Sequence, residues 1–410
     1  MAKLLLNGNH AAANACKDVG VQVIAAYPIT PQSPIVERLS RFVDDGKLNA
    51  EFVRVESEHS AITVCIAAST TGARVFTASS ANGLCLMHEQ LHWAAGSRLP
   101  IVLACANRAP AAPWNVWTDE QDSISQRDTG WVQLYCEDNQ EIYDTIIQAY
   151  KLGEDPEIYA PVMVCFDGYI LSHTMMPVET IDDSNLIKEF LPPYKPHTHL
   201  DPNDPCIVNL VTFPWIRHDP DKPGIEKMGA YPEFRYALQQ SLLKVPEKFK
   251  KIDKEFGDKF GRYYGIYKEY LCDDAEFIIF GIGTLACEAR ISADLLRKQG
   301  FKVGLINLKL YRPFPRDDLI EFITKHPDIK GIIVFDRNLS YGYEGAVCTD
   351  LKSTLYSAHF DIPVHNYIAG IGGGNITAEQ IASATKKSCE MILKGQIDKK
   401  PEWINIDMED

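Results

Sequence analysis

The feature that most constrains the fold is an alternation of short apolar stretches with helix-like stretches through the first 175 residues. The apolar stretches show little polar alternation, which is typical of strands buried on both faces. They lie at 21–26, 52–55, 74–78, 101–106, 132–135 and 162–166, and helix-like stretches include 33–42, 58–69 and 83–95. This order predicts a parallel sheet with helices on both sides.

The same alternation returns near residue 271. Expected strands there are 277–280, 303–306, 332–335 and 364–367, with helices at 288–299, 317–325 and 378–393. Between the two regions the sequence is rich in proline, aromatic and charged residues, as at 201–205 and 247–268, and we expect one or two helices there. The predicted architecture is therefore α/β, with parallel-sheet domains at 1–175 and 271–400 joined by a long arm at 176–270. The 410 residues suit two or three domains at about 150 residues each.

Charge and cysteine usage narrow the class of protein. The formal net charge of -14 is spread along the chain, which argues against binding to a nucleic-acid backbone. The first apolar run is too short for a signal peptide, and no stretch approaches the ~20 apolar residues of a membrane span, so a cytoplasmic protein is expected. None of the eleven cysteines lies within four positions of another, so the local pairs typical of zinc and iron-sulfur sites are absent.

Polar residues follow the first four expected strands of the first domain. In an open parallel sheet, ligands bind beyond the carboxyl ends of the strands. Thr30 lies between two prolines after the first strand, and Glu58 opens the helix after the second. Ser80 follows the third strand and Arg108 the fourth. Topology alone therefore predicts that these four residues share one rim.

Each of the rim residues also has a structural interpretation. A glutamate at a helix start often only complements the helix dipole. The helix after Glu58 is so apolar that it is expected to lack a solvent face, so Glu58 should be buried and need a partner, which favours a functional role. Arg108 follows an apolar strand, where a guanidinium suits recognition of a carboxylate. Thr30 is equally compatible with an ordinary proline turn.

Two short motifs suggest other functions. His88 and His92 fit the zinc-hydrolase pattern H-E-x-x-H, but the sequence offers only Asp119 or Glu120 as a third ligand. Residues 281–286 fit G-x-G-x-x-A, yet the following strand ends without an acid for a ribose hydroxyl. A packing turn or an anion site is the better interpretation of the second motif.

Taken together, several motifs closely resemble the alpha subunits of pyruvate:ferredoxin and related 2-oxoacid:acceptor oxidoreductases. The motifs are Tyr-Pro-Ile-Thr-Pro at 27–31, Glu-Ser-Glu-His-Ser-Ala at 56–61, the segments 72–80 and 92–96, Asn-Arg-Ala at 107–109, Gln-Arg-Asp-Thr-Gly-Trp at 126–131 and 167–173. The likeness continues through 190–194, 311–315, 336–337 and 367–370, and so covers essentially the whole chain. The resemblance implies a thiamine diphosphate pyrimidine-binding domain followed by a domain like the transketolase C-terminal domain.

The resemblance also implies roles for the rim. Glu58 matches the glutamate that holds the aminopyrimidine of thiamine diphosphate, and Thr30 and Arg108 match residues that bind the 2-oxoacid carboxylate. Pro28, Ile29 and Ser80 are expected to contact the cofactor, and no metal ligand is expected in this chain. Magnesium, the diphosphate site and [4Fe-4S] clusters should lie on partner subunits of beta, gamma and delta type. Coenzyme A would be the acyl acceptor, and ferredoxin or another carrier would take the electrons.

The substrate is where this sequence departs from the pyruvate enzymes it resembles. Those tend to have a methionine in the segment after Asn-Arg-Ala, whereas this chain has Pro-Ala-Ala-Pro-Trp at 110–114. Pyruvate remains the favoured substrate, but an aromatic or branched 2-oxoacid such as phenylglyoxylate is the alternative if Pro110 and Ala112 line the pocket. The non-enzymatic alternative is a scaffold subunit whose polar rim closes an interface.

Overall fold

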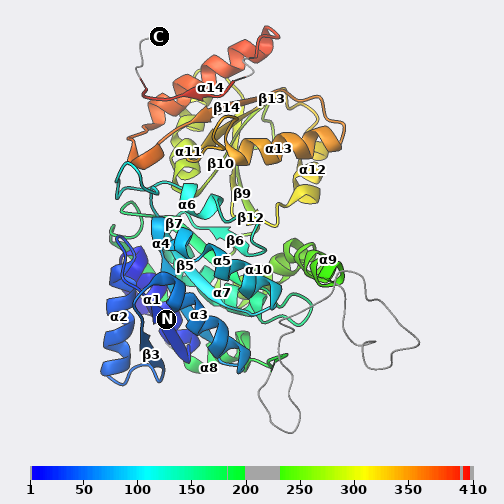
Figure 1. The fold of residues 1–410 in the computed structure, drawn as a ribbon. Coiled ribbons are helices and arrows are strands. Elements are labelled where there is room, and N and C mark those ends of the chain that lie inside the picture. The colour runs from blue at the N-terminus through cyan, green and yellow to red at the C-terminus, as the bar shows by residue number, and fades with distance from the viewer. Residues whose placement is uncertain (1, 182, 199–230, 398–399, 407–410) are drawn as a thin grey trace, which may run out of the picture.

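The computed structural model describes residues 2–181, 183–198, 231–397 and 400–406 and forms two α/β units, one above the other in Figure 1. The lower unit is built on a seven-stranded sheet in the order β12-β6-β7-β5-β4-β2-β3. Its strands are β2 (Val23–Ala26), β3 (Glu51–Arg54), β4 (Val75–Ser79), β5 (Val102–Asn107), β6 (Val132–Tyr135), β7 (Val162–Asp167) and β12 (Leu310–Arg312). All neighbours pair in parallel except β12, which runs antiparallel to β6.

Helices cover both faces of this sheet, as the apolar strands predict. They are α1 (Gly8–Val19), α2 (Ser33–Asp44), α3 (Glu58–Thr70), α4 (Ala81–Leu86), α5 (His88–Gly96), α6 (Gln121–Ile124) and α7 (Asn139–Gly153). Along β5, Val102 and Ala104 enter a core shared with α1 and α7, whereas Leu103 and Cys105 enter a core shared with α3 and α5. Alternate residues therefore face opposite layers, and both must be apolar.

The expectation that α3 lacks a solvent face is wrong for the described chain. Ala61, Ile62 and Cys65 are buried against the sheet, but Thr63 and Ala67 are exposed. The helix is apolar all round, so its composition could not show which side would stay uncovered.

The upper unit holds a six-stranded sheet in the order β15-β14-β13-β10-β11-β9. Its strands are β9 (Tyr267–Tyr270), β10 (Phe277–Ile282), β11 (Val303–Leu308), β13 (Gly331–Asp336), β14 (Val364–Ile368) and β15 (Glu402–Trp403). The helices are α11 (Gly283–Lys298), α12 (Arg316–Lys325), α13 (Ala346–Ser357) and α14 (Ala378–Leu393), with a 3₁₀ turn η1 at Ile371–Gly373. Pairing is parallel except at β9, which runs antiparallel to β11.

The region expected as a connecting arm contains more regular structure than one or two helices. It begins with β8 (Met176–Thr180), which pairs antiparallel with β1 (Ala2–Leu6), and continues with α8 (Ser184–Phe190), α9 (Tyr231–Leu242) and α10 (Val245–Phe260). The proline-rich stretch 201–205 lies outside the described residues. The arm also supplies β9 to the upper sheet, and the upper unit returns β12 to the lower sheet.

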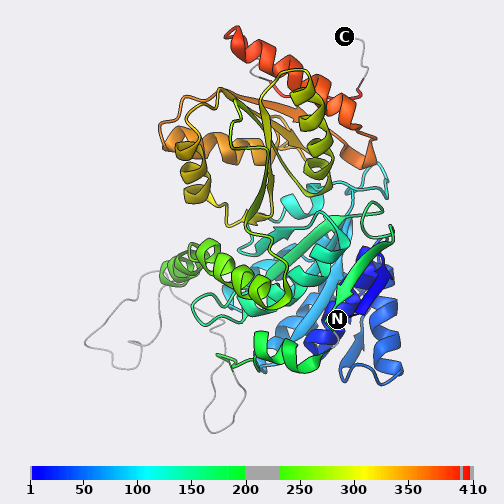
Figure 2. The same cartoon turned by 180° about the vertical axis from the view of Figure 1, so that it is seen from behind.

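Helix α10 packs against α7 of the lower unit, which Figure 2 shows from behind. Its buried apolar residues recur every three or four positions, so they form one stripe while the lysines face outward. The stripe is Val245, Phe249, Ile252, Phe256 and Phe260. Gly261 ends the helix at a φ of 76°, a left-handed conformation that glycine adopts without steric cost. Among the described residues, no helix combines the length and apolarity needed to cross a membrane.

Candidate active site

The carboxyl ends of β2, β3, β4 and β5 bring together the four loops that carry the predicted rim. These strands are neighbours in the sheet order β5-β4-β2-β3, so their following loops lie along one edge. Contacts then join the loops in a chain: Arg108 reaches the Thr30 loop, and the loop at 79–83 contacts both Glu58 and the segment after Arg108. The predicted rim residues are therefore close in space.

Arg108 is a buried cation whose side chain spans two loops. It is 5% exposed, and its Nη1 donates to the Thr30 carbonyl oxygen at 2.9 Å. Its Nε donates to the Asn115 carbonyl oxygen at 3.0 Å, and the Trp114 ring lies 5.8 Å from the guanidinium carbon. Within the described chain nothing accepts from Nη2, so one N–H pair stays free for an anion.

Thr30 meets Arg108 through its backbone rather than its side chain. The Thr30 residue is exposed, and no described residue bonds to its hydroxyl. The turn before it is fixed because Gln32 Nε2 donates to the Tyr27 carbonyl at 2.8 Å. Pro28 is exposed and Ile29 is half-buried beside it, with the Ile29 carbonyl accepting from the Gln32 amide at 2.9 Å.

Glu58 is buried, with 7% of its surface exposed, although α3 does have a solvent face. It is the first residue of α3, behind Ser57, whose hydroxyl oxygen accepts from the Ser60 amide at 3.2 Å. A Cβ at Gly83 would lie 2.5 Å from Glu58 Oε1 and 2.7 Å from Ser79 Oγ, so only glycine lets the carboxylate and the hydroxyl lie against the backbone here. Across the described ranges, the Glu58 carboxylate has no hydrogen bond or ion pair, and the buried Ser79 Oγ also lacks a partner.

A carboxylate with little exposure and no partner in the described chain is available to accept from an external donor. Ser80 does not supply one. It is fully buried, and its hydroxyl donates to the Ser79 carbonyl oxygen at 2.8 Å. In this structure Ser80 therefore offers no exposed surface for the predicted contact with a cofactor.

Sequence reasoning missed Asp122, a fully buried carboxylate in the short helix α6. Its Oδ2 accepts from the Ala81 amide at 2.8 Å and from the Arg108 amide at 3.0 Å. Burial raises its pKa to about 6, although these amides and Asn107 lower it. The segment has no hydrophobic periodicity, so only its place after the Arg108 loop could have drawn attention to it.

The zinc-hydrolase hypothesis finds no support at His88 and His92. Their rings meet edge to face at 5.0 Å, and His88 Nδ1 lies 2.5 Å from Gln126 Oε1. Glu89 is turned toward His59, and its Oε2 lies 3.8 Å from His59 Nε2. No cluster of three or more metal-ligating side chains occurs in the part of the chain that the structure describes.

The proposed third zinc ligands serve instead at the junction of the two units. Asp119 Oδ2 accepts from the Gly372 amide at 3.0 Å, and the Glu120 amide donates to the Arg337 carbonyl at 3.1 Å. Burial raises the pKa of Asp119 to about 6 and that of the Glu120 carboxyl well above its usual value. Both acids thus belong to the contact between the units.

The glycine motif at 281–286 does bind an anion, but the anion belongs to the chain. The Thr284 amide at the start of α11 donates to Asp167 Oδ2 at 3.2 Å, and Arg337 Nη1 lies 3.0 Å from Asp167 Oδ1. Burial raises the pKa of Asp167, but Arg337 and the Thr284 and Thr118 hydroxyls outweigh it and hold that pKa below its usual value. The helix N-terminus is therefore occupied by a carboxylate of the lower unit.

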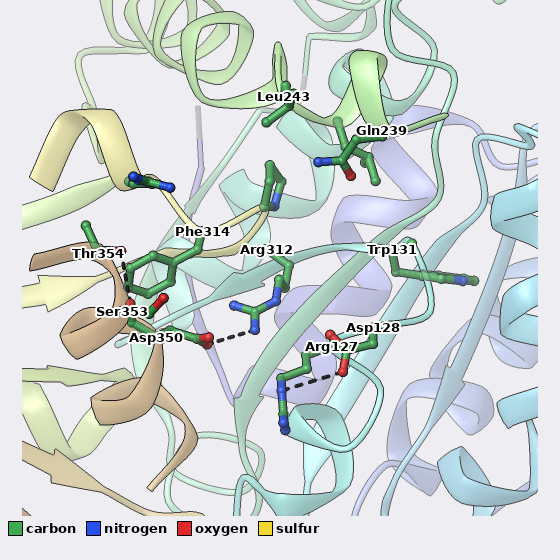
Figure 3. Close-up of a pocket in the computed structure, with 14 residues that line it drawn as sticks. Arg127, Asp128, Trp131, Gln239, Leu243, Arg312, Phe314, Asp350, Ser353 and Thr354 are labelled. Carbon is green, nitrogen blue, oxygen red and sulfur yellow. Dashed lines mark hydrogen bonds and ion pairs between the residues drawn. The ribbon is translucent and has the colours of Figure 1, made fainter. Parts of the chain in front are cut away.

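A separate hollow of about 470 Å³ lies where the loop before β6, α9 and α13 meet (Figure 3). Arg312 Nη2 lies 2.7 Å from Asp350 Oδ2 in its wall, and Trp131 and Phe314 add aromatic surface. The hollow borders the amino end of β6, whereas the rim lies at carboxyl ends, and the two share no residue.

Comparison with known families gives two matches along the chain. Residues 14–256 match the family described as pyruvate flavodoxin/ferredoxin oxidoreductase, thiamine diphosphate-binding. Residues 275–381 match the family described as pyruvate:ferredoxin oxidoreductase core domain II.

Curated relatives align over nearly their whole length. The chain is 44% identical over 407 residues to ketoisovalerate oxidoreductase subunit VorA of Pyrococcus horikoshii, with 98% of each chain covered. It is 42% identical over 381 residues to pyruvate synthase subunit PorA of Methanocaldococcus jannaschii, with 92% of each covered.

Solved structures share the fold at lower identity. A 2-oxoglutarate:ferredoxin oxidoreductase from Magnetococcus marinus superposes with a TM-score of 0.70 at 20% identity, covering 94% of this chain and 65% of that one. A split-gene transketolase superposes with a TM-score of 0.54 at 12% identity, covering 94% and 98%.

Proposed function

Because this chain belongs to the alpha subunits of the 2-oxoacid:ferredoxin oxidoreductases, we propose that its rim is the pyrimidine-side half of a thiamine diphosphate site. At this site a 2-oxoacid would be oxidatively decarboxylated and its acyl group passed to coenzyme A. The observation that carries the proposal is the buried Glu58 carboxylate, which packs against Gly83 and has no partner among the described residues.

The residues around Glu58 fit an aminopyrimidine. A flat ring with N–H donors and ring nitrogens suits a carboxylate that no residue of the described chain engages, with the unpaired Ser79 hydroxyl close to it. When bound, thiamine diphosphate would supply the carbon nucleophile and the electron sink for decarboxylation. Glu58 would hold a proton at the pyrimidine ring nitrogen N1′, and Pro28 and Ile29 would border the ring.

Arg108 and Thr30 would bind the substrate carboxylate. The free Nη2 of Arg108 is held in place because Nη1 and Nε are already bonded to the Thr30 and Asn115 carbonyls. A guanidinium fixed in this way loses little entropy when it binds an anion. The Thr30 hydroxyl, which no described residue engages, would give a second donor.

Pyruvate is the substrate that we propose first. The family that matches residues 14–256 is described by pyruvate, and pyruvate synthase subunits are 40–42% identical to the chain. A second candidate is a 2-oxoacid with a branched or aromatic side chain. The segment after Arg108 has Pro110 and Ala112 in place of a bulky flexible residue, and the ketoisovalerate relatives are 44% identical.

The remaining parts of the reaction would come from companion subunits in the cytoplasm. The relatives are named as subunits, and the described residues hold no metal-ligating cluster. Magnesium, the diphosphate site and [4Fe-4S] clusters are therefore assigned to beta, gamma and delta-type partners. Ferredoxin is proposed as the electron acceptor.

The test is substrate-dependent reduction of an electron acceptor by the intact complex in the presence of coenzyme A. We expect turnover with 2-oxoacids and a kcat/KM for pyruvate above those for 3-methyl-2-oxobutanoate and phenylglyoxylate. If kcat/KM for pyruvate is well below kcat/KM for either larger acid, that larger acid replaces pyruvate as the proposed substrate. A complex that consumes no 2-oxoacid would overturn the function itself.

A further inference from the structure

Two backbone amides at the rim depend on one carboxylate that lies behind it. The Ala81 amide belongs to the first residue of α4 and the Arg108 amide follows β5, and both point at Oδ2 of Asp122. Helices α4 and α6 contact each other, and Figure 1 shows them near the junction of the two units. The loop that borders Glu58 and the loop that carries Arg108 are thus tied to the same atom.

The second oxygen of Asp122 is equally engaged. Its Oδ1 accepts from Asn107 Nδ2 at 2.7 Å and from the Ser123 amide at 2.7 Å. Asn107 also donates to Ser123 Oγ at 2.6 Å, and Ser123 Oγ lies 2.7 Å from the Tyr135 hydroxyl. Asp122 has no ion-pair partner within the described ranges, so four N–H groups stabilise the carboxylate.

The Ala81 contact fixes an unusual backbone. Ala81 has a φ of 45°, a left-handed conformation that a residue with a Cβ adopts only when its surroundings hold it there. The bond to Asp122 supplies that restraint at the residue that directly follows Ser80. Asn82 continues the link, since its Oδ1 accepts from the Ala111 amide at 2.9 Å.

We propose that Asp122 is a positioning residue for the substrate site: it sets the place of Arg108 against the loop at 79–83 and thereby the affinity for the 2-oxoacid carboxylate. This inference rests on the proposed function. Asp122 acts through Arg108 and not on the reacting atoms, because its carboxylate is fully buried behind both loops.

The decisive variant is Asp122→Asn, which keeps the shape but replaces one acceptor oxygen by an amide donor. Two of the four N–H groups then face another donor, whichever way the amide turns. In the intact complex we expect KM for pyruvate to rise roughly tenfold while kcat changes less, since the loss falls on carboxylate binding. Asp128→Asn is the matched control, because Asp128 lies between α6 and β6 with 82% of its side chain exposed, and its KM should equal that of the native complex.

A double-mutant cycle separates positioning from a general loss of structure. If Asp122 acts through Arg108, the complex with both Asp122→Asn and Arg108→Ala should have a KM within about twofold of Arg108→Ala alone. If the KM increases of the two single variants instead multiply in the double variant, the inference is wrong. An unchanged KM in Asp122→Asn, in a complex that turns over pyruvate, would overturn it while leaving the proposed function intact.

A milder variant covers the case in which Asp122→Asn does not assemble. Asn107→Ala removes one donor to Oδ1 and leaves both rim amides bonded to Oδ2. We expect a smaller rise in KM in the same direction, and an unchanged KM would again contradict the inference. A native complex without activity on any 2-oxoacid would overturn the proposed function, and this inference with it.

Discussion

At the scale of single residues, Glu58 is the side chain on which the proposed chemistry depends. Glu58→Gln keeps the volume beside Gly83 but removes the acid, so the complex should assemble and lose about 10²- to 10⁴-fold in kcat. Steady-state turnover with pyruvate measures this. Glu56→Gln, at an exposed acid two positions earlier, should leave turnover unchanged. Near-normal turnover in Glu58→Gln would mean that another carboxylate has the role.

Arg108 is the side chain that we expect to bind the substrate carboxylate. Charged hydrogen bonds of this kind contribute about 1.5–3 kcal/mol, so Arg108→Ala should raise KM for any 2-oxoacid by roughly ten- to a hundredfold. Arg316→Ala, at an exposed arginine of the upper unit, is the control and should not change KM. The carboxylate site is misassigned if KM stays the same in Arg108→Ala.

The sequence was a good guide to which residues form the rim and a poor guide to how they meet. Strand-end positions predicted Thr30, Glu58, Ser80 and Arg108 because parallel topology places such positions together. It could not show that Arg108 contacts the Thr30 carbonyl, or that the Ser80 hydroxyl bonds to Ser79. Those details depend on rotamers and on loops that have no periodic pattern.

At the scale of elements, the start of α13 offers a prediction on pH. Asp336 is fully buried and accepts from the Val347 and Cys348 amides at 3.2 Å. Burial raises its pKa to about 7 despite these bonds and those from Asn338 and Asn366. A raised carboxyl pKa means that the folded state holds its proton longer than the unfolded state. The stability from this group is therefore complete below pH ~4 and is lost as pH rises through about 7.

We therefore expect the thermal midpoint of the native complex, relative to one with Asp336→Asn, to fall as pH rises from 5 to 8. The free-energy change should be on the order of a few kcal/mol, from the ~1.4 kcal/mol that each pKa unit represents. Asp317→Asn, at an exposed aspartate of α12, should show a difference that does not vary with pH. If the difference in thermal midpoint between the native and Asp336→Asn complexes does not change with pH, Asp336 does not titrate as expected.

The elements themselves were largely predictable where they are long and apolar. The expected strands 101–106 and 162–166 correspond to β5 and β7, because buried parallel strands are almost wholly apolar. Strands β1, β9 and β12 were missed or assigned elsewhere. They are short edge strands, and a partner strand far along the chain selects them rather than local pattern.

At the scale of the whole molecule, the carboxyl ends of the two sheets meet. Asp167 ends β7 of the lower sheet and pairs with Arg337, which follows β13 of the upper sheet. Asn115 Nδ2 donates to the Gly372 carbonyl at 2.8 Å in the same junction. These residues lie far apart along the chain. The sequence around Asp167 therefore could not show that it would pair with Arg337.

The chain alone should be inactive and free of iron. Its ten described cysteines are free thiols, eight of them buried, and they behave as small apolar residues. Iron and labile sulfide analysis of the purified chain, with an activity assay, checks this expectation. Stoichiometric iron and sulfide in this chain alone would contradict the assignment of the clusters to companion subunits.

The most direct test of the central claim is the thiamine diphosphate content of the purified complex. We expect thiamine diphosphate to be retained in a fixed ratio to this chain in the native complex, and to be lost when the complex is rebuilt with Glu58→Ala. Glu56→Ala should retain it. Equal retention in the Glu58→Ala and native complexes, or none in the native complex, would contradict the placement of the cofactor at this rim and favour a scaffold role for the chain.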